Sequence, residues 1–89
     1  MIEKEAEIVN RLGLHARAAA KLVHTAGGFQ SRVILEKDGE EVDAKSILGV
    51  LLLAAGQGSQ VKIRCEGADE QDALRAVTDL IANRFDEEI

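Results

Sequence analysis

A histidine and an arginine separated by one residue, His15 and Arg17, stand at the start of an alanine-rich stretch of this chain. A free imidazole has a pKa of about 6.5, so a useful fraction of it is neutral and nucleophilic near neutral pH. Strong helix formers follow from Ala16 to Ala26, which predicts that His15 lies at the amino end of a helix. The unpaired amides and the dipole at that end favour an anion, and a guanidinium can bind two phosphoryl oxygens at once. This combination could take up a phosphoryl group.

Other readings of these residue types are simpler. Judged by spacing alone, a capping or surface role for His15 is the more common one. A metal site needs several His or Cys ligands close together, which His15, His24 and Cys65 do not provide. Residues 56–58 lack the longer glycine pattern of a nucleotide-binding loop. We therefore expect neither a bound metal nor a cofactor.

Charge and composition restrict the partners of this chain. Its 89 residues suffice for one domain, residues 1–89, and its net charge of -5 opposes binding to nucleic acid or anionic membranes. The longest apolar run, residues 50–55, is far too short to span a bilayer, and the charged start MIEKEAEI is unlike a signal peptide. A single cysteine fits a reducing compartment. We expect a cytoplasmic protein with no nucleic-acid binding and no membrane insertion.

Hydrophobic periodicity predicts four strands. Polar and apolar residues alternate over 2–9 and 60–66, which is typical of strands with one face in water. Asp38 and Gly39 tolerate positive φ and stand between two further strand-like runs, so they predict a hairpin. An antiparallel sheet with one solvated face accounts for this pattern.

Three helical segments complete the predicted fold. One covers residues 16–26, a short apolar one covers about 47–53 after a Ser46 cap, and the last begins after an Asp69 cap. The order is β-α-β-β-α-β-α, an α+β fold in which a four-stranded antiparallel sheet carries three helices on one face. The short helix is apolar nearly all round, so some of its side chains must remain exposed.

The segments GLHARAAAKLV (residues 13–23), AKSILGV (residues 44–50) and GADEQDAL (residues 67–74) resemble the HPr family of phosphocarriers of the phosphoenolpyruvate-dependent phosphotransferase system. The resemblance covers nearly the whole chain. It implies an open-faced β-sandwich in which Enzyme I places a phosphoryl group on the δ nitrogen of His15. A histidine of an Enzyme IIA domain then receives the group, and Arg17 would neutralise charge in both transfers. Such a protein is a carrier and not an enzyme.

The resemblance also implies a regulatory site and a docking surface. In many members the serine at the position of Ser46 is phosphorylated by the ATP-dependent HPr kinase/phosphorylase. Apolar residues of the short helix, together with the loop that carries His15, would contact both partners. The expected partner-binding residues are Leu14, Ala16, Ala20, Ile47, Leu48 and Leu51. A small carrier that docks two partners in turn is expected to be a monomer.

One departure from the family pattern concerns the residue after Arg17. Most members have proline there, whereas this chain has Ala18, which keeps a backbone amide and a good helix propensity. Paralogues of the nitrogen-regulatory branch often lack that proline, so sugar uptake does not follow from the sequence. A regulatory binding module, controlled by phosphorylation of Ser46 or His15, stays open as the alternative. A free-standing phosphotransferase or hydrolase is disfavoured because the sequence shows no carboxylate pair, metal site or nucleotide loop.

Overall fold

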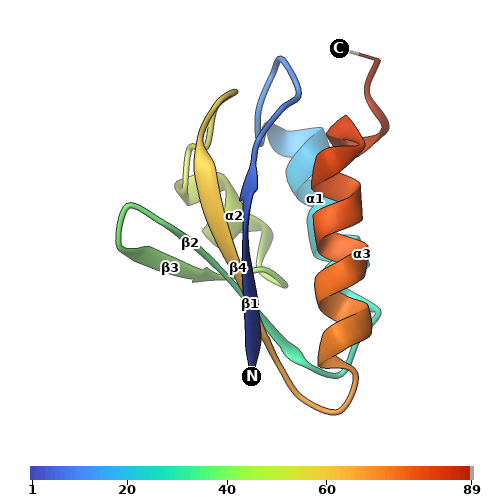
Figure 1. Ribbon diagram of the computed structural model, residues 1–89. Helices are drawn as coiled ribbons and strands as arrows, with labels where there is room; N and C mark the ends of the chain where they lie inside the picture. Colours follow the sequence, from blue (N-terminus) through green and yellow to red (C-terminus); the bar gives the residue numbers. More distant parts are fainter. Residues whose placement is uncertain (89) are drawn as a thin grey trace.

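The alternating segments of the sequence form one antiparallel sheet with strand order β1-β4-β2-β3, in a computed structural model that describes residues 1–88 (Figure 1). Strand β1 pairs with β4 from Ile2 opposite Cys65 to Glu7 opposite Gln60. The elements are β1 (Ile2–Glu7), α1 (Ala16–Gly27), β2 (Arg32–Lys37), β3 (Glu40–Asp43), α2 (Ile47–Leu52), β4 (Gln60–Glu66) and α3 (Glu70–Ala82). The predicted order and fold class are confirmed.

Helices α1 and α3 lie side by side over the sheet, and α2 contacts both α1 and β3 (Figure 1). The period-2 pattern of β4 holds, because Val61, Ile63 and Cys65 are buried while the alternate side chains reach the solvated face. Helix α3 buries a narrow stripe of side chains. Its fully buried members are Ala73, Val77 and Ile81, whereas Leu74 and Leu80 lie at the margin of the core.

The predicted hairpin and the cap of α2 both form. Asp38 and Gly39 have φ of 53° and 85°, so both central residues of the two-residue turn are left-handed, as a type I′ hairpin requires. At the start of α2, Ser46 Oγ accepts a hydrogen bond from the Gly49 amide at 3.3 Å. Both predictions, which rested on the local sequence alone, are therefore confirmed.

The expectation that Asp69 caps α3 is wrong. Asp69 occupies the cap position, but its carboxylate makes no hydrogen bond to the amides of that helix. It accepts instead from the amides of Gln30 and Ser31, both at 2.9 Å, and from the Ser31 hydroxyl at 2.5 Å. These bonds, led by the one from the Ser31 hydroxyl, lower the pKa of Asp69 to about 2. The carboxylate thus clamps the segment before β2 to the start of α3.

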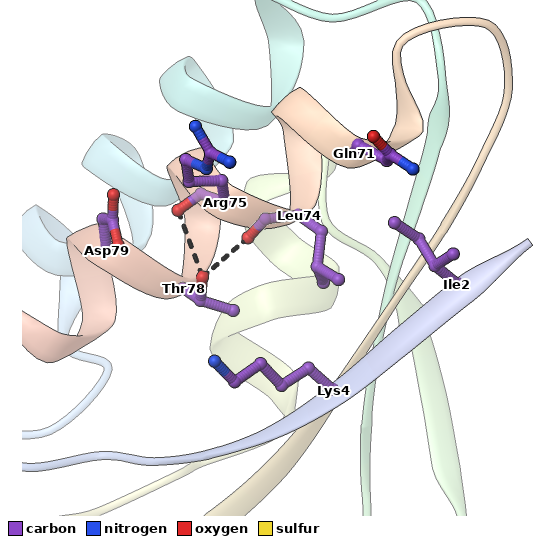
Figure 2. Close-up of a pocket in the computed structure, with 7 residues that line it drawn as sticks. All are labelled: Ile2, Lys4, Gln71, Leu74, Arg75, Thr78 and Asp79. Carbon is purple, nitrogen blue, oxygen red and sulfur yellow. Dashed lines mark hydrogen bonds between the residues drawn. The ribbon is translucent and has the colours of Figure 1, made fainter.

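Lys4 interrupts the apolar face of β1 because β1 is an edge strand beside α3. Figure 2 shows the Lys4 side chain extending past Leu74 and Thr78 of that helix. These residues contribute to a depression of about 470 Å³ between β1 and α3. The Thr78 hydroxyl donates to the carbonyls of Leu74 at 2.8 Å and Arg75 at 3.1 Å, so it is used within the helix. The exposed ammonium and its alkyl stem explain how lysine is tolerated here.

A short 3-10 turn, η1 (Arg84–Asp86), follows α3 and was not predicted. Its three residues all have positive φ, 59°, 52° and 64°, and its central residue Phe85 is fully buried. The Phe85 carbonyl accepts a hydrogen bond from Lys21 Nζ of α1 at 2.7 Å. This hydrogen bond and the burial of Phe85 hold η1 against α1.

The loop before α1 is fixed by a close backbone approach. The Leu14 amide donates to the Ala55 carbonyl at 2.8 Å, and Gly13 has φ of +67°. A Cβ on Gly13 would lie 2.6 Å from the Ala55 oxygen and 2.8 Å from the Gly56 Cα. Only glycine meets both the conformation and the space, so this contact determines where α1 begins.

Gly13→Ala should destabilise the fold far more than Gly39→Ala. Both glycines are left-handed, but a Cβ on Gly39 meets nothing within 4 Å. We expect urea unfolding to show a loss of about 1–2 kcal/mol for Gly39→Ala from backbone strain alone. For Gly13→Ala the added clash brings the loss to roughly 2–5 kcal/mol. Equal losses would contradict the proposed role of the close approach.

The Asp69 clamp should make stability depend on acidity. Its pKa is about 2 in the fold against an ordinary 3.8, so its contribution is complete above 3.8 and is lost as pH falls through 2. Asp69→Asn should lower the melting temperature near pH 7, and its difference from the wild type should vanish between pH 3.8 and 2. Asp72→Asn, an exposed change in the same helical turn, is the matched control and should have a smaller effect. Indistinguishable melting curves for the two variants would show that the clamp contributes nothing.

Candidate functional site

His15 is the amino cap of α1, where the sequence places it. Its backbone is extended, with φ of -75° and ψ of 179°, and its Nδ1 accepts a hydrogen bond from the Arg17 amide at 3.2 Å. The first turn of α1 carries no acidic residue. The ring nitrogen therefore lies at the positive end of the helix dipole, where backbone amides without a partner inside the helix can bind an anion.

The other nitrogen of His15 has a partner that the sequence did not reveal. Nε2 contacts the Glu87 carboxylate, which comes from the segment after η1. Glu87 Oε1 also accepts from the side-chain amide of Asn10 at 3.0 Å, and the bonds from Asn10 and His15 lower the pKa of Glu87. The one signal for this packing was Phe85, a large apolar residue after the last helix. Nothing in the sequence pointed to Glu87 itself.

Arg17 lies beside His15 on the exposed side of the first turn. The two residues line a shallow depression of about 500 Å³ together with Leu12, Ala16 and Glu87. The His15 side chain is 28% exposed, so the ring is reachable from solvent. A ring nitrogen, helix amides and an exposed guanidinium thus share one open surface, which suits transfer of a group between proteins better than enclosure of a small substrate.

The six predicted partner-binding residues do not all reach the surface. Ala16, Ala20, Ile47 and Leu48 are exposed, and Leu48 is 71% exposed. Leu51 is only partly exposed because it packs against the core. Leu14 is 5% exposed and belongs to the core, and its backbone amide donates a hydrogen bond to the Ala55 carbonyl. Leu14 is therefore unsuited to the contact role that the sequence predicted for it.

Two exposed leucines were missed. Leu12 is 64% exposed beside His15, and Leu52 is 72% exposed at the end of α2. The sequence showed that some apolar side chains of α2 must face solvent, but not which ones. Leu12 gave no periodic signal because it lies in an irregular loop.

Within residues 1–88 no group of three or more His, Cys, Asp or Glu side chains is placed to hold a metal ion. No helix in that range has the length and apolar character needed to cross a membrane. Cys65 is buried in β4, and burial raises the pKa of its thiol.

Comparison with known proteins connects this geometry to one family. The family model described as PTS HPr component phosphorylation site matches residues 2–83. The phosphocarrier protein HPr of Cupriavidus necator is 54% identical over 87 residues, which cover 98% of each chain. The crystal structure of HPr-C-His from Thermoanaerobacter tengcongensis has a TM-score of 0.97 and 48% identity over the full length of both chains. An HPr dimer from the same organism has a TM-score of 0.79 and 48% identity, over 98% of this chain and 100% of that one.

The family match extends over the whole fold. Residues 2–83 include all four strands and α1 to α3, whereas η1 and Glu87 lie beyond the matched range. The shared features are therefore the sheet, the histidine loop and α2 together. By sequence and by structure, the chain belongs to the HPr family of phosphocarrier proteins of the phosphotransferase system.

Proposed function

We propose that this chain, acting as one domain of residues 1–89, accepts a phosphoryl group from Enzyme I on His15 and passes it to a histidine of an Enzyme IIA domain. The main support for the proposal is the position of His15 Nδ1 at the amino end of α1, where it lies 3.2 Å from the backbone nitrogen of Arg17. The chain takes part in the transfer as a carrier, without a cofactor and without net turnover of its own.

The amino end of α1 supplies the binding site for the phosphoryl oxygens. In the free protein the Arg17 amide donates to Nδ1. When Nδ1 forms its bond to phosphorus, that amide is released to donate to a phosphoryl oxygen, as helix amino ends commonly do. No acidic side chain of the first turn opposes the incoming dianion. An acidic protein can thus hold phosphate locally.

Arg17 contributes charge rather than nucleophilicity. Its exposed side chain lines the depression beside His15 and can swing over the transferred group. A guanidinium offers paired donors to phosphoryl oxygens, and such contacts strengthen as charge develops on those oxygens during transfer. Arg17 would therefore act in both transfers, since the same group arrives and leaves at this place.

The docking surface combines the start of α1 with α2. Helix α2, which carries the exposed Ile47 and Leu48, packs against α1, which carries the exposed Ala16 and Ala20. We assign these four residues, with the partly exposed Leu51, to partner contact, and we add Leu12 because it lies beside His15. An apolar patch around a reactive side chain favours transient docking of one partner after another. A monomer that functions in the cytoplasm fits this use, although a relative forms a dimer.

Ser46 is the second proposed phosphorylation site, modified by HPr kinase/phosphorylase. Its hydroxyl caps α2 through the Gly49 amide and stands directly before Ile47 of the docking surface. A phosphate there adds about -1.5 to -2 charges next to an apolar contact, which weakens docking by desolvation and by repulsion of acidic partners. Helix α2 itself should tolerate the charge, because it is added at the amino end.

Incubation with phosphoenolpyruvate and Enzyme I should label the chain with an acid-labile, base-stable phosphate, and His15→Ala should abolish the label. Arg17→Ala should slow labelling on the order of a hundredfold, as loss of one transition-state donor does, while its melting temperature stays near that of the wild type. Arg75→Ala is the matched control, because Arg75 is exposed on α3 in the depression beside β1. A wild type that takes up no label, or His15→Ala that labels normally, would exclude the carrier function.

Incubation with HPr kinase and ATP should give an acid-stable phosphate that is absent in Ser46→Ala and present in Ser59→Ala. The phosphorylated protein should then be labelled from phosphoenolpyruvate about tenfold more slowly or worse, with an unchanged circular dichroism spectrum. Labelling by kinase without any labelling by Enzyme I would favour the regulatory binding module. A Ser46→Ala protein that still accepts phosphate would exclude Ser46 as the site.

A further inference from the structure

We propose that Glu87 is a positioning residue for the phosphoryl acceptor. By accepting a hydrogen bond from His15 Nε2, it holds the ring in the one tautomer whose Nδ1 lone pair can attack phosphorus. The proposal rests on the proposed function, in which His15 carries the phosphoryl group, and it assigns a role to a segment beyond the family match at residue 83.

The contacts of the two ring nitrogens select the tautomer. A neutral imidazole carries one N–H, on either Nδ1 or Nε2. Nδ1 faces the amide of Arg17, which can only donate, and Nε2 faces the Glu87 carboxylate, which when ionised can only accept. Both contacts are satisfied together only when the proton is on Nε2. Nδ1 then keeps a lone pair directed toward the amide end of α1.

The Glu87 carboxylate is held in place from a buried side. Asn10 is fully buried, and its side-chain NH₂ donates to Glu87 Oε1 at 3.0 Å and to the Gly13 carbonyl at 2.8 Å. Both of these partners are acceptors, which fixes the orientation of the amide. The Glu87 side chain is only 16% exposed. Asn10 thus ties the end of the chain to the histidine loop.

The turn before Glu87 supports the same geometry. The three residues of η1 have positive φ, a conformation that costs energy for residues other than glycine. Burial of Phe85 and the bond from Lys21 to its carbonyl keep the turn in this form. A strained turn with two anchors directs the following carboxylate to one place, which is how neighbouring structure commonly pre-positions a reactive group.

The carboxylate also matches the charge that appears during transfer. The Nδ1 lone pair forms the N–P bond while the bond from phosphorus to the donor breaks, and its electron pair leaves with the donor. The proton on Nε2 stays, so the ring becomes a phosphoimidazolium cation. Charged groups around the ring and the carboxylate are Arg17 and Lys21 of α1, and Glu87 is the anion in contact with the ring. An ionised partner on Nε2 stabilises that cation as a carboxylate does in a catalytic triad.

The test compares Glu87→Ala with Glu88→Ala, a matched loss of charge at the next, exposed position. In unphosphorylated wild type and Glu88→Ala, NMR should detect a slowly exchanging Nε2–H proton of His15, with ring ¹⁵N shifts of the Nε2–H tautomer. In Glu87→Ala this proton should exchange as fast as that of the exposed His24, and labelling by Enzyme I and phosphoenolpyruvate should slow on the order of tenfold. Glu87→Gln, which retains an acceptor without the charge, should restore the Nε2–H signal and only part of the rate.

Equal Nε2–H exchange and equal labelling rates in Glu87→Ala and Glu88→Ala would overturn the proposal, and so would faster labelling of Glu87→Ala. If Glu87→Ala melts too low for study, Glu87→Gln decides in its place, because a labelling rate equal to that of the wild type would rule out the role of the charge. Failure of the wild type to accept phosphate would reject the carrier function. The NMR comparison would then still decide whether Glu87 fixes the tautomer, because it uses the unphosphorylated chain.

Discussion

The approach of the Gly13 backbone to Ala55 is the constraint on which the site depends. The Leu14 amide donates a hydrogen bond to the Ala55 carbonyl, and the space between the two loops leaves no room for a Cβ on Gly13. Because this contact fixes the last residues before α1, it fixes the cap position of His15. The segment after α2, far along the chain, therefore determines how the first helix begins. The position of His15 thus depends on packing between the loop before α1 and the loop after α2.

An acidic chain can handle phosphate because its positive potential is local. The net charge is -5, yet the first turn of α1 has no acidic side chain and presents helix-end amides and Arg17 beside the ring. Helix-end amides act over a few ångströms, so they favour an anion at His15 without attracting polyanions to the whole surface. The same locality leaves the rest of the surface available for polar contacts such as those of Arg64 with Glu3, Glu36 and Glu41 across the sheet.

The exposed apolar side chains of α2 follow from the shortness of that helix. A helix of six residues cannot bury every side, so Val50 enters the core while Leu48 and Leu52 remain in water. Helix α2 packs on α1, the helix that His15 caps, so these side chains belong to the neighbouring helix. The proposed docking surface is thus a consequence of a helix too short to bury all of its apolar side chains.

The sequence by itself determined the elements and the position of the candidate nucleophile, His15. Periodicity, turn residues and helix caps are local properties, so the strands, the hairpin at Asp38 and Gly39, the Ser46 cap and the place of His15 could be predicted. The sequence could not determine contacts between residues distant in the chain. Asp69 looks like a helix cap but bonds Ser31, Leu14 looks like a contact residue but is buried, and Glu87 reaches His15 from the far end. Only the tertiary structure decided these, because which polar group meets which depends on how loops from separate elements pack, and no local pattern encodes that meeting.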